Sequence, residues 1–130
     1  MNPDNQSQLE GTSLTGFDPV AKVETLQILD TVPGSGDEVQ PGATVTAHYT
    51  GALCANGIIF QSSHDMGQPA TFPLGNVIEG WQKGVPGMKV GGTRRLLIPA
   101  AQAYGSRSPS SNIPPNSDLV FDIELVEIAA

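Results

Sequence analysis

The strongest constraint on the fold of this chain is a short amphipathic segment that can form only a short helix. Val77, Ile78, Trp81 and Val85 recur at spacings of three and four residues, which predicts one apolar stripe along a helix. Residues 86–87 are Pro-Gly and end this pattern, so the helix spans only about two to three turns. A helix of that length is not stable alone. The rest of the chain must therefore enclose it.

The start of this helix also carries a signal. Asn76 is followed three residues later by Glu79, a spacing typical of a capping box with Asn76 as the N-cap residue. The other backbone N–H groups of the first turn, which the cap does not bond, have no acceptor within the helix.

The segments around the helix read as strands. Val45, Ala47 and Tyr49 alternate with polar residues, which places them on one face of a strand. We expect strands over residues 22–30, 43–50, 58–61, 68–74, 93–98 and 118–128, with Gly51 ending the second. A single helical turn is expected within 99–104, and a long loop over 105–117. Strands joined by turns, with one helix, predict an antiparallel α+β domain whose twisted sheet buries one face against the helix.

Length and charge limit the classes of function. The 130 residues suffice for one domain with a real core, and we expect a flexible polar tail over 1–20 before a domain over 21–130. Phe17 and Val20 are the tail residues expected to touch that domain. The net charge of −7 argues against nucleic-acid binding. No segment resembles a signal peptide or a membrane span, so the expected location is cytoplasmic, without membrane association.

Residues that could perform covalent or metal chemistry do not assemble into a site. Cys54 is the single cysteine, and a structural residue at a turn is favoured over a reactive nucleophile. His48 is interpreted as a structural histidine, and His64 as a solvated loop residue. Asp122 and Glu124 are expected on a solvated face. Neither a metal site nor a cofactor is predicted.

The aromatic residues are the more informative set. They are few, at 5% of the chain, yet most of them fall on separate predicted elements around the start of the helix: Tyr49, Phe60, Phe72, Trp81, Tyr104 and Phe121. They could simply form the core, or they could line an apolar pocket at the start of the helix, as in many small-ligand sites. Spacing alone favours the core, but the convergence of these elements on one helix N-terminus and the place of Tyr104 at the head of the long loop favour a pocket.

Motifs in one order extend this picture. They cover residues 45–51, 60–63, 77–81, 103–105, 113–115 and 119–125. Together they resemble the FK506-binding protein (FKBP) family of peptidyl-prolyl cis-trans isomerases, over about residues 22–128. The resemblance implies a curved five- to six-stranded antiparallel sheet wrapped around one short helix, with the active pocket between them.

The resemblance also implies roles for single residues. Trp81 would form the pocket floor beneath the proline ring of the substrate. The backbone N–H of Ile78 and the hydroxyl of Tyr104 would donate hydrogen bonds to substrate carbonyls. Walls would come from Tyr49, Phe60, Val77, Ile78 and Phe121, while Gln61 belongs to the catalytic set and Phe72 and Ile113 to the substrate contacts.

Three positions depart from the family pattern. Gln61 stands where an Asp commonly follows the Phe, so a carboxylate of the pocket is replaced by a neutral amide. Ala70 replaces a frequent aromatic residue on the strand before the helix, and the polar residues 109–112 replace a more apolar run.

The function implied is a monomeric isomerase that accelerates rotation about X-Pro bonds in peptides and unfolded proteins and binds FK506 or rapamycin. A binding or chaperone module that keeps the fold but turns over poorly is the rival hypothesis, which Gln61 and Ala70 favour. The third hypothesis is a small β-rich domain that has a packed core and no binding site.

Overall fold

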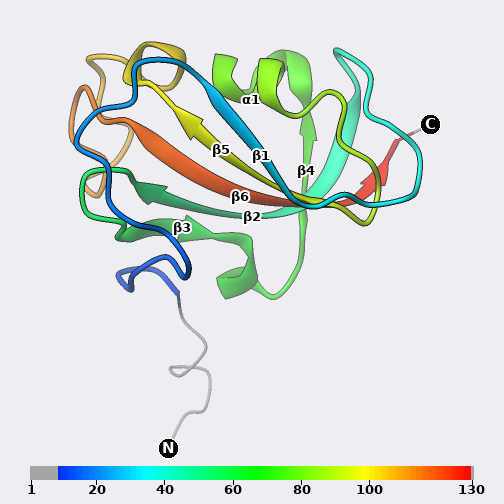
Figure 1. Cartoon of the computed structure of the whole chain (residues 1–130), viewed down its shortest axis with the longest axis horizontal. Helices are drawn as coiled ribbons and strands as arrows, with labels where there is room; N and C mark the ends of the chain where they lie inside the picture. Colours follow the sequence, from blue (N-terminus) through cyan, green and yellow to red (C-terminus); the bar gives the residue numbers. More distant parts are fainter. Residues whose placement is uncertain (1–8, 130) are drawn as a thin grey trace, which may run out of the picture.

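The architecture is one antiparallel sheet with a short helix against it, as seen in a computed structural model that describes residues 9–129 (Figure 1). Within these residues the sheet has 6 strands, in the order β1-β5-β6-β2-β3, and β4 also pairs with β2. The strands are β1 (Gln27–Val32), β2 (Thr44–Leu53), β3 (Ile59–Ser62), β4 (Ala70–Pro73), β5 (Thr93–Ile98) and β6 (Leu119–Ile128). The predicted α+β class, with a curved sheet around one short helix, is confirmed.

The long strands β2 and β6 form the centre of the sheet and pair along their whole length. The other edge of β2 is shared, because its first half pairs with β4 and its second half with β3. The chain crosses from β3 to β4 through the 3-10 helix η2 (Ser63–Met66). In Figure 1, β4 runs up toward α1, while β3 forms the edge of the sheet beyond β2.

Two strand predictions need correction. The first strand was expected over residues 22–30 but lies at Gln27–Val32, because Val23 is buried and its N–H donates to Asp118 Oδ2 at 2.8 Å. The second strand continues through Gly51 to Leu53 instead of ending there. A Cβ at Gly51 would lie 2.6 Å from Phe60 Cζ and 2.7 Å from Phe121 Cε1. Gly51 thus makes room for two aromatic rings and is not a strand terminator.

The helix α1 (Glu79–Gly84) is shorter than predicted, at 6 residues, and its capping box is absent. Asn76 belongs to the preceding 3-10 helix η3 (Leu74–Asn76), and the N-cap position is held by Ile78. Val77 and Ile78 are both extended, with ψ angles of 173° and 153°. Their branched Cβ atoms favour this conformation over the helical one. The apolar pattern at 77–78 is therefore real, but it belongs to an extended entry into the helix.

Two glycines let the helix lie directly on β5. A Cβ at Gly80 would lie 2.5 Å from Ile98 Cγ2, and a Cβ at Gly84 would lie 2.7 Å from both Leu96 Cδ atoms. Because residues four apart share one helix face, the two glycines form a single flat surface on the side of the sheet. Ile98 and Leu96 fill that surface and are both fully buried.

Arg94 on β5 closes the other end of the helix. Its Nη1 atom donates to the carbonyl oxygen of Gly84 at 2.7 Å, while its Nε atom donates to Asp30 Oδ1 on β1 at 2.6 Å. A cation at this position satisfies a helix carbonyl that has no partner within the helix. The Arg94 hydrogen bond lowers the pKa of Asp30 from its usual 3.8. One side chain thus joins β1, β5 and the end of α1.

The core lies on both faces of the sheet. The face toward α1 holds the larger cluster, which contains Trp81 and the inward side chains of β2, β5 and β6. The opposite face holds a smaller cluster that includes Leu14, Val23, Cys54, Leu97 and Val120.

The start of the chain covers this second face, so its described part buries apolar side chains although residues 1–20 were expected to be a polar tail. Leu14 is 7% exposed, and Ser13 bridges to Ile58. The expected contacts of Phe17 and Val20 with the body are present. Residues 1–8 of the expected tail lie outside the described residues, and the division into a tail and a domain stays a prediction. Within residues 9–129 no helix is long and apolar enough to cross a membrane.

The contact between α1 and β5 predicts that Gly80→Ala destabilises the protein. The added methyl group must displace Ile98 in a packed core, which costs about 1 to 3 kcal/mol and outweighs the better helix propensity of Ala, worth at most about 1 kcal/mol. We expect a net loss of about 1 to 2 kcal/mol in the free energy of unfolding, measured by urea denaturation. Lys83→Ala on the exposed side of the same helix is the control and should change stability by less than about 0.5 kcal/mol. Equal stabilities of Gly80→Ala and wild type would show that the contact is not tight.

Candidate functional site

A cavity of about 330 Å³ opens where the sheet meets the start of α1. It is lined by Tyr49, Phe60, Gln61, Phe72, Asn76, Val77, Ile78, Trp81, Tyr104 and Phe121. These residues come from β2, β3, β4, β6, from α1 and its entry, and from the segment after the 3-10 helix η4 (Ala100–Gln102). Segments distant in the sequence therefore build one concave, largely aromatic surface.

Trp81 is the centre of this surface. Its ring lies edge-to-face against Tyr49, Phe72 and Phe121, with centroid distances of 5.8, 5.0 and 5.5 Å. Pairs in this geometry each contribute about 0.5 to 1.5 kcal/mol beyond the area they bury. Trp81 is only 4% exposed, so its neighbours hold it in one orientation, with its ring forming part of the cavity wall.

A further aromatic pair continues this surface from Trp81 through Phe121. Phe60 and Phe121 pack edge-to-face at a centroid distance of 5.8 Å. Gly51 on β2 lies beneath them, where any side chain would collide with both rings. The absent side chain of Gly51 lets the two phenylalanines sit close to the sheet.

A few polar groups face this apolar cavity. Among residues 9–129 no protein group accepts a hydrogen bond from the N–H of Ile78, whose own carbonyl accepts from the N–H groups of Trp81 and Gln82 at 3.0 and 3.2 Å. The side chains of Gln61, Asn76 and Tyr104 also line the cavity. Burial raises the pKa of Tyr49 above its usual 10.0, and the nearby Tyr104 adds to this shift. Tyr49 thus stays a neutral phenol at physiological pH. The site offers hydrogen-bond donors and no charge.

The structure brings together nearly all of the residues predicted for the site. Tyr49, Phe60, Gln61, Phe72, Val77, Ile78, Trp81, Tyr104 and Phe121 line the cavity. Ile113 does not: it is buried and borders an adjoining hollow. Asn76 was assigned only to helix capping, and its place in the lining was missed. The signal was available, because Asn76 directly precedes two residues predicted to line the pocket. Their catalytic roles stay predictions.

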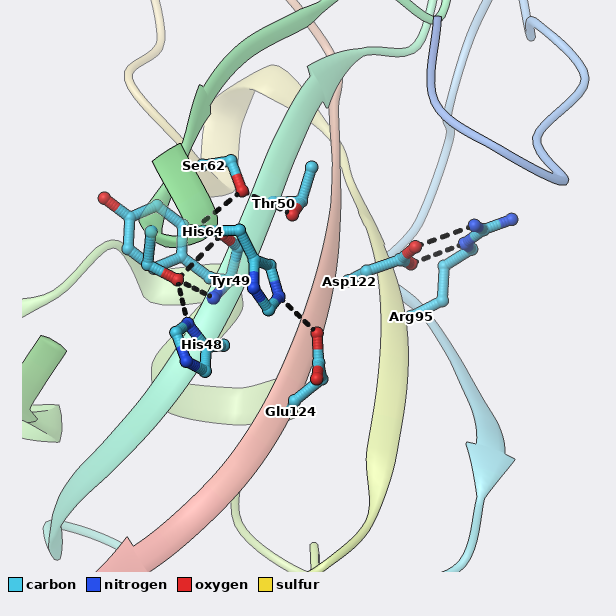
Figure 2. A network of polar contacts seen from close by, with 9 residues as sticks. His48, Tyr49, Thr50, Ser62, His64, Arg95, Asp122 and Glu124 are labelled. Atoms are coloured by element: carbon cyan, nitrogen blue, oxygen red, sulfur yellow. Dashed lines mark hydrogen bonds and ion pairs between the residues drawn. The ribbon is translucent and has the colours of Figure 1, made fainter. Parts of the chain in front are cut away.

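The two histidines do not line the cavity; they belong to a polar network that meets the lining only at the backbone of Tyr49 (Figure 2). His48 and His64 stack with a centroid distance of 4.1 Å, and His64 Nε2 lies 2.7 Å from Glu124 Oε2. His48 Nδ1 lies 2.9 Å from Ser63 Oγ, a serine partner that the sequence did not reveal. Ser63 is fully buried and its hydroxyl also accepts from the N–H of Tyr49, so it is a structural group and not an accessible nucleophile.

This network corrects two expectations. His64 is exposed, but it is held by the stacking and by Glu124 instead of being merely solvated. Asp122 likewise forms a bidentate pair with Arg95, at 2.6 and 2.8 Å, visible in Figure 2. The interpretation of His48 as a structural histidine agrees with its contacts. Among the described residues no group of three or more His, Cys, Asp or Glu side chains could hold a metal ion.

Comparisons with known proteins agree with this geometry. Residues 36–126 match the family model of the FKBP-type peptidyl-prolyl cis-trans isomerases. The chain is similar to the peptidyl-prolyl cis-trans isomerase FPR2 of Saccharomyces cerevisiae, with 50% identity over 70% of this chain and 69% of that protein. It is similar to the FK506-binding protein of Neisseria meningitidis, with 45% identity over 80% of this chain and 96% of that protein. The crystal structure of AtFKBP13 superposes with a TM-score of 0.74 at 41% identity, covering 83% of this chain and 96% of that one.

Cys54 gives a prediction that separates a structural thiol from a reactive one. It is fully buried, and burial with the nearby Asp118 raises its pKa to about 12. Only the thiolate reacts with disulfide reagents, so at pH 8 roughly one molecule in ten thousand carries it. We expect labelling of the native protein by a chromogenic disulfide to be at least about 100-fold slower than labelling in guanidinium chloride. Rapid stoichiometric labelling of the folded protein would contradict the structural assignment.

Proposed function

The chain belongs to the FKBP-type peptidyl-prolyl cis-trans isomerases, and we propose that the aromatic cavity around Trp81 is the place where it rotates X-Pro bonds. The observation that supports this best is the combination of an apolar floor with backbone N–H groups at the entry to α1 that have no acceptor among the described residues. Trp81 is held by three aromatic neighbours, and Ile78, whose N–H has no acceptor among the described residues, lines the same cavity. A proline ring would rest on Trp81 while this N–H binds a substrate carbonyl.

The reaction explains why no nucleophile or acid–base pair is needed. Rotation about an X-Pro amide is slow because resonance imposes a barrier of roughly 20 kcal/mol. No covalent bond breaks during this rotation. The planar amide carries separated charge, which water solvates well. The twisted transition state has lost this resonance and carries less charge on oxygen.

A dry aromatic cavity therefore favours the transition state over the planar ground state, which is differential binding. The Ile78 N–H and the Tyr104 hydroxyl would hold substrate carbonyls, so that the ring can rotate against a fixed chain. An acceleration of about 10⁵ requires about 7 kcal/mol. Desolvation and one or two hydrogen bonds supply a free energy of this order.

The same cavity supports proposals on ligands and assembly. Proline-containing peptides and unfolded proteins are the proposed substrates of this cavity. Macrolides of the FK506 and rapamycin type would compete with them for it, because the macrolides and the X-Pro segment each present an apolar ring flanked by carbonyl groups. We also propose that a monomer is the active unit, because residues of a single chain suffice to form the cavity. The cytoplasmic location stays a prediction that cell fractionation would test.

The direct test of the function is a proline-limited peptide isomerisation assay with and without rapamycin. Tyr104→Phe removes one hydroxyl and keeps the ring, so the loss of one hydrogen bond should lower kcat/KM about fivefold. Ser106→Ala, an exposed position in the same loop, serves as the control and should match wild type. A folded wild-type sample that accelerates nothing would favour the binding module over the enzyme.

Gln61 allows a test of the role of charge in the site. It lines the cavity and retains hydrogen-bonding capacity, but it lacks the fixed negative charge of the Asp that commonly follows the Phe. We expect Gln61→Asp to change turnover and rapamycin affinity by several-fold without abolishing either, since the charge acts on the substrate dipoles and not on a bond that breaks. Gln40→Glu places the same kind of charge at an exposed position outside the cavity lining and controls for net charge. Unchanged turnover and affinity in Gln61→Asp would show that the neutral residue is equivalent.

A further inference from the structure

A second hollow adjoins the aromatic cavity and shares three lining residues with it. It has a volume of about 300 Å³ and is lined by Glu10, Phe60, Gln61, Tyr104, Pro109, Ser110, Asn112 and Ile113. Phe60, Gln61 and Tyr104 line both spaces. A peptide with its proline on Trp81 can therefore extend across these three side chains into the second hollow.

The segment that carries Glu10 is held in place beside β3. Asp65 accepts hydrogen bonds from the N–H groups of Leu9 and Glu10, at 2.7 and 3.0 Å. The next residues pair with β3, because the N–H of Gly11 donates to Ile59 O and the N–H of Ile59 donates to Thr12 O, both at 2.8 Å. Glu10 is thus positioned by backbone contacts on both sides, although it precedes the first strand.

The side chain of Glu10 joins this segment to the long loop. Its Oε2 atom accepts a hydrogen bond from Asn112 Nδ2 at 3.0 Å, and the same Nδ2 donates to Phe60 O at 3.3 Å. A carboxylate can accept about four hydrogen bonds, so capacity remains for a cation. Among the described residues lining this hollow, Glu10 is the one that carries a carboxylate, and none is Lys, Arg or His.

From this arrangement we propose that the second hollow is a specificity subsite, in which Glu10 selects proline-containing peptides with a basic residue close to the proline. The inference rests on the proposed function, since it names the substrate class of the same site. A Lys or Arg side chain would place its aliphatic stem on Phe60 and Ile113 and its charge at Glu10. The net charge of −7 would assist the approach of such peptides.

Glu10→Gln tests the subsite, because an amide oxygen can still accept the hydrogen bond from Asn112 while the charge is removed. Two matched pairs of proline peptides carry Lys or Gln, either two residues before or two residues after the proline. The measured quantity is the ratio of kcat/KM for the Lys peptide to that for the Gln peptide. In at least one pair we expect this ratio to exceed one for wild type and to fall about two- to fivefold in Glu10→Gln. Glu24→Gln, an exposed carboxylate outside both hollows, should leave the ratio at its wild-type value.

Two results would overturn the proposal: a ratio that is the same in Glu10→Gln and wild type, or a fall of equal size in Glu24→Gln. The same peptides are also titrated while the fluorescence of Trp81, the single tryptophan, is followed. This readout gives the Lys-to-Gln ratio as affinities and does not depend on turnover. Failure of the wild type to accelerate any peptide would therefore refute the proposed function, while the affinity ratio still decides the subsite.

Discussion

The close contact between α1 and β5 is the constraint on which the rest of this structure depends. Gly80 and Gly84 present no side chains, so Ile98 and Leu96 fill the space that two Cβ atoms would need. A helix of 6 residues has little stability of its own, and this contact supplies what its own hydrogen bonds cannot. Because α1 lies flat on the sheet, Trp81 on its neighbouring face meets Tyr49 and the other rings of the cavity.

The two faces of the sheet support the site in different ways. The inner face provides aromatic walls, whereas the outer face carries the polar network of Figure 2. Thr50 Oγ1 lies 2.8 Å from Ser62 Oγ, and Ser63 Oγ bonds the backbone of Tyr49, so β3 and the turn after it are tied to β2. Phe60 lies on β3, two residues before this tie. The outer contacts thereby hold one wall of the cavity in position without touching a ligand.

Sequence patterns predicted the elements well where one interaction dominates. The strand expected over residues 93–98 is present with the same bounds, since alternation against a single packed face is a strong signal. The capping box predicted at Asn76 is absent because tertiary packing keeps Val77 and Ile78 extended beside the cavity. The helix therefore begins only at Glu79. The prediction that Gly51 ends a strand is wrong for a similar reason. The glycine is needed because Phe60 and Phe121 occupy the space of a side chain there, and these two residues are distant in the sequence.

By itself the sequence determined the α+β class through local periodicity, and its motifs in a fixed order carried the family resemblance, which implied nearly every side chain of the aromatic cavity. Tertiary structure decided what depends on distant pairs. The tertiary structure shows that Ile113 lines the adjoining hollow and not the aromatic cavity, and that His48 forms a hydrogen bond with Ser63. Glu10 reaches Asn112 across 102 positions of the chain, a contact that no local pattern encodes. Such contacts are set by how the strands pair, and pairing is a property of the whole sheet.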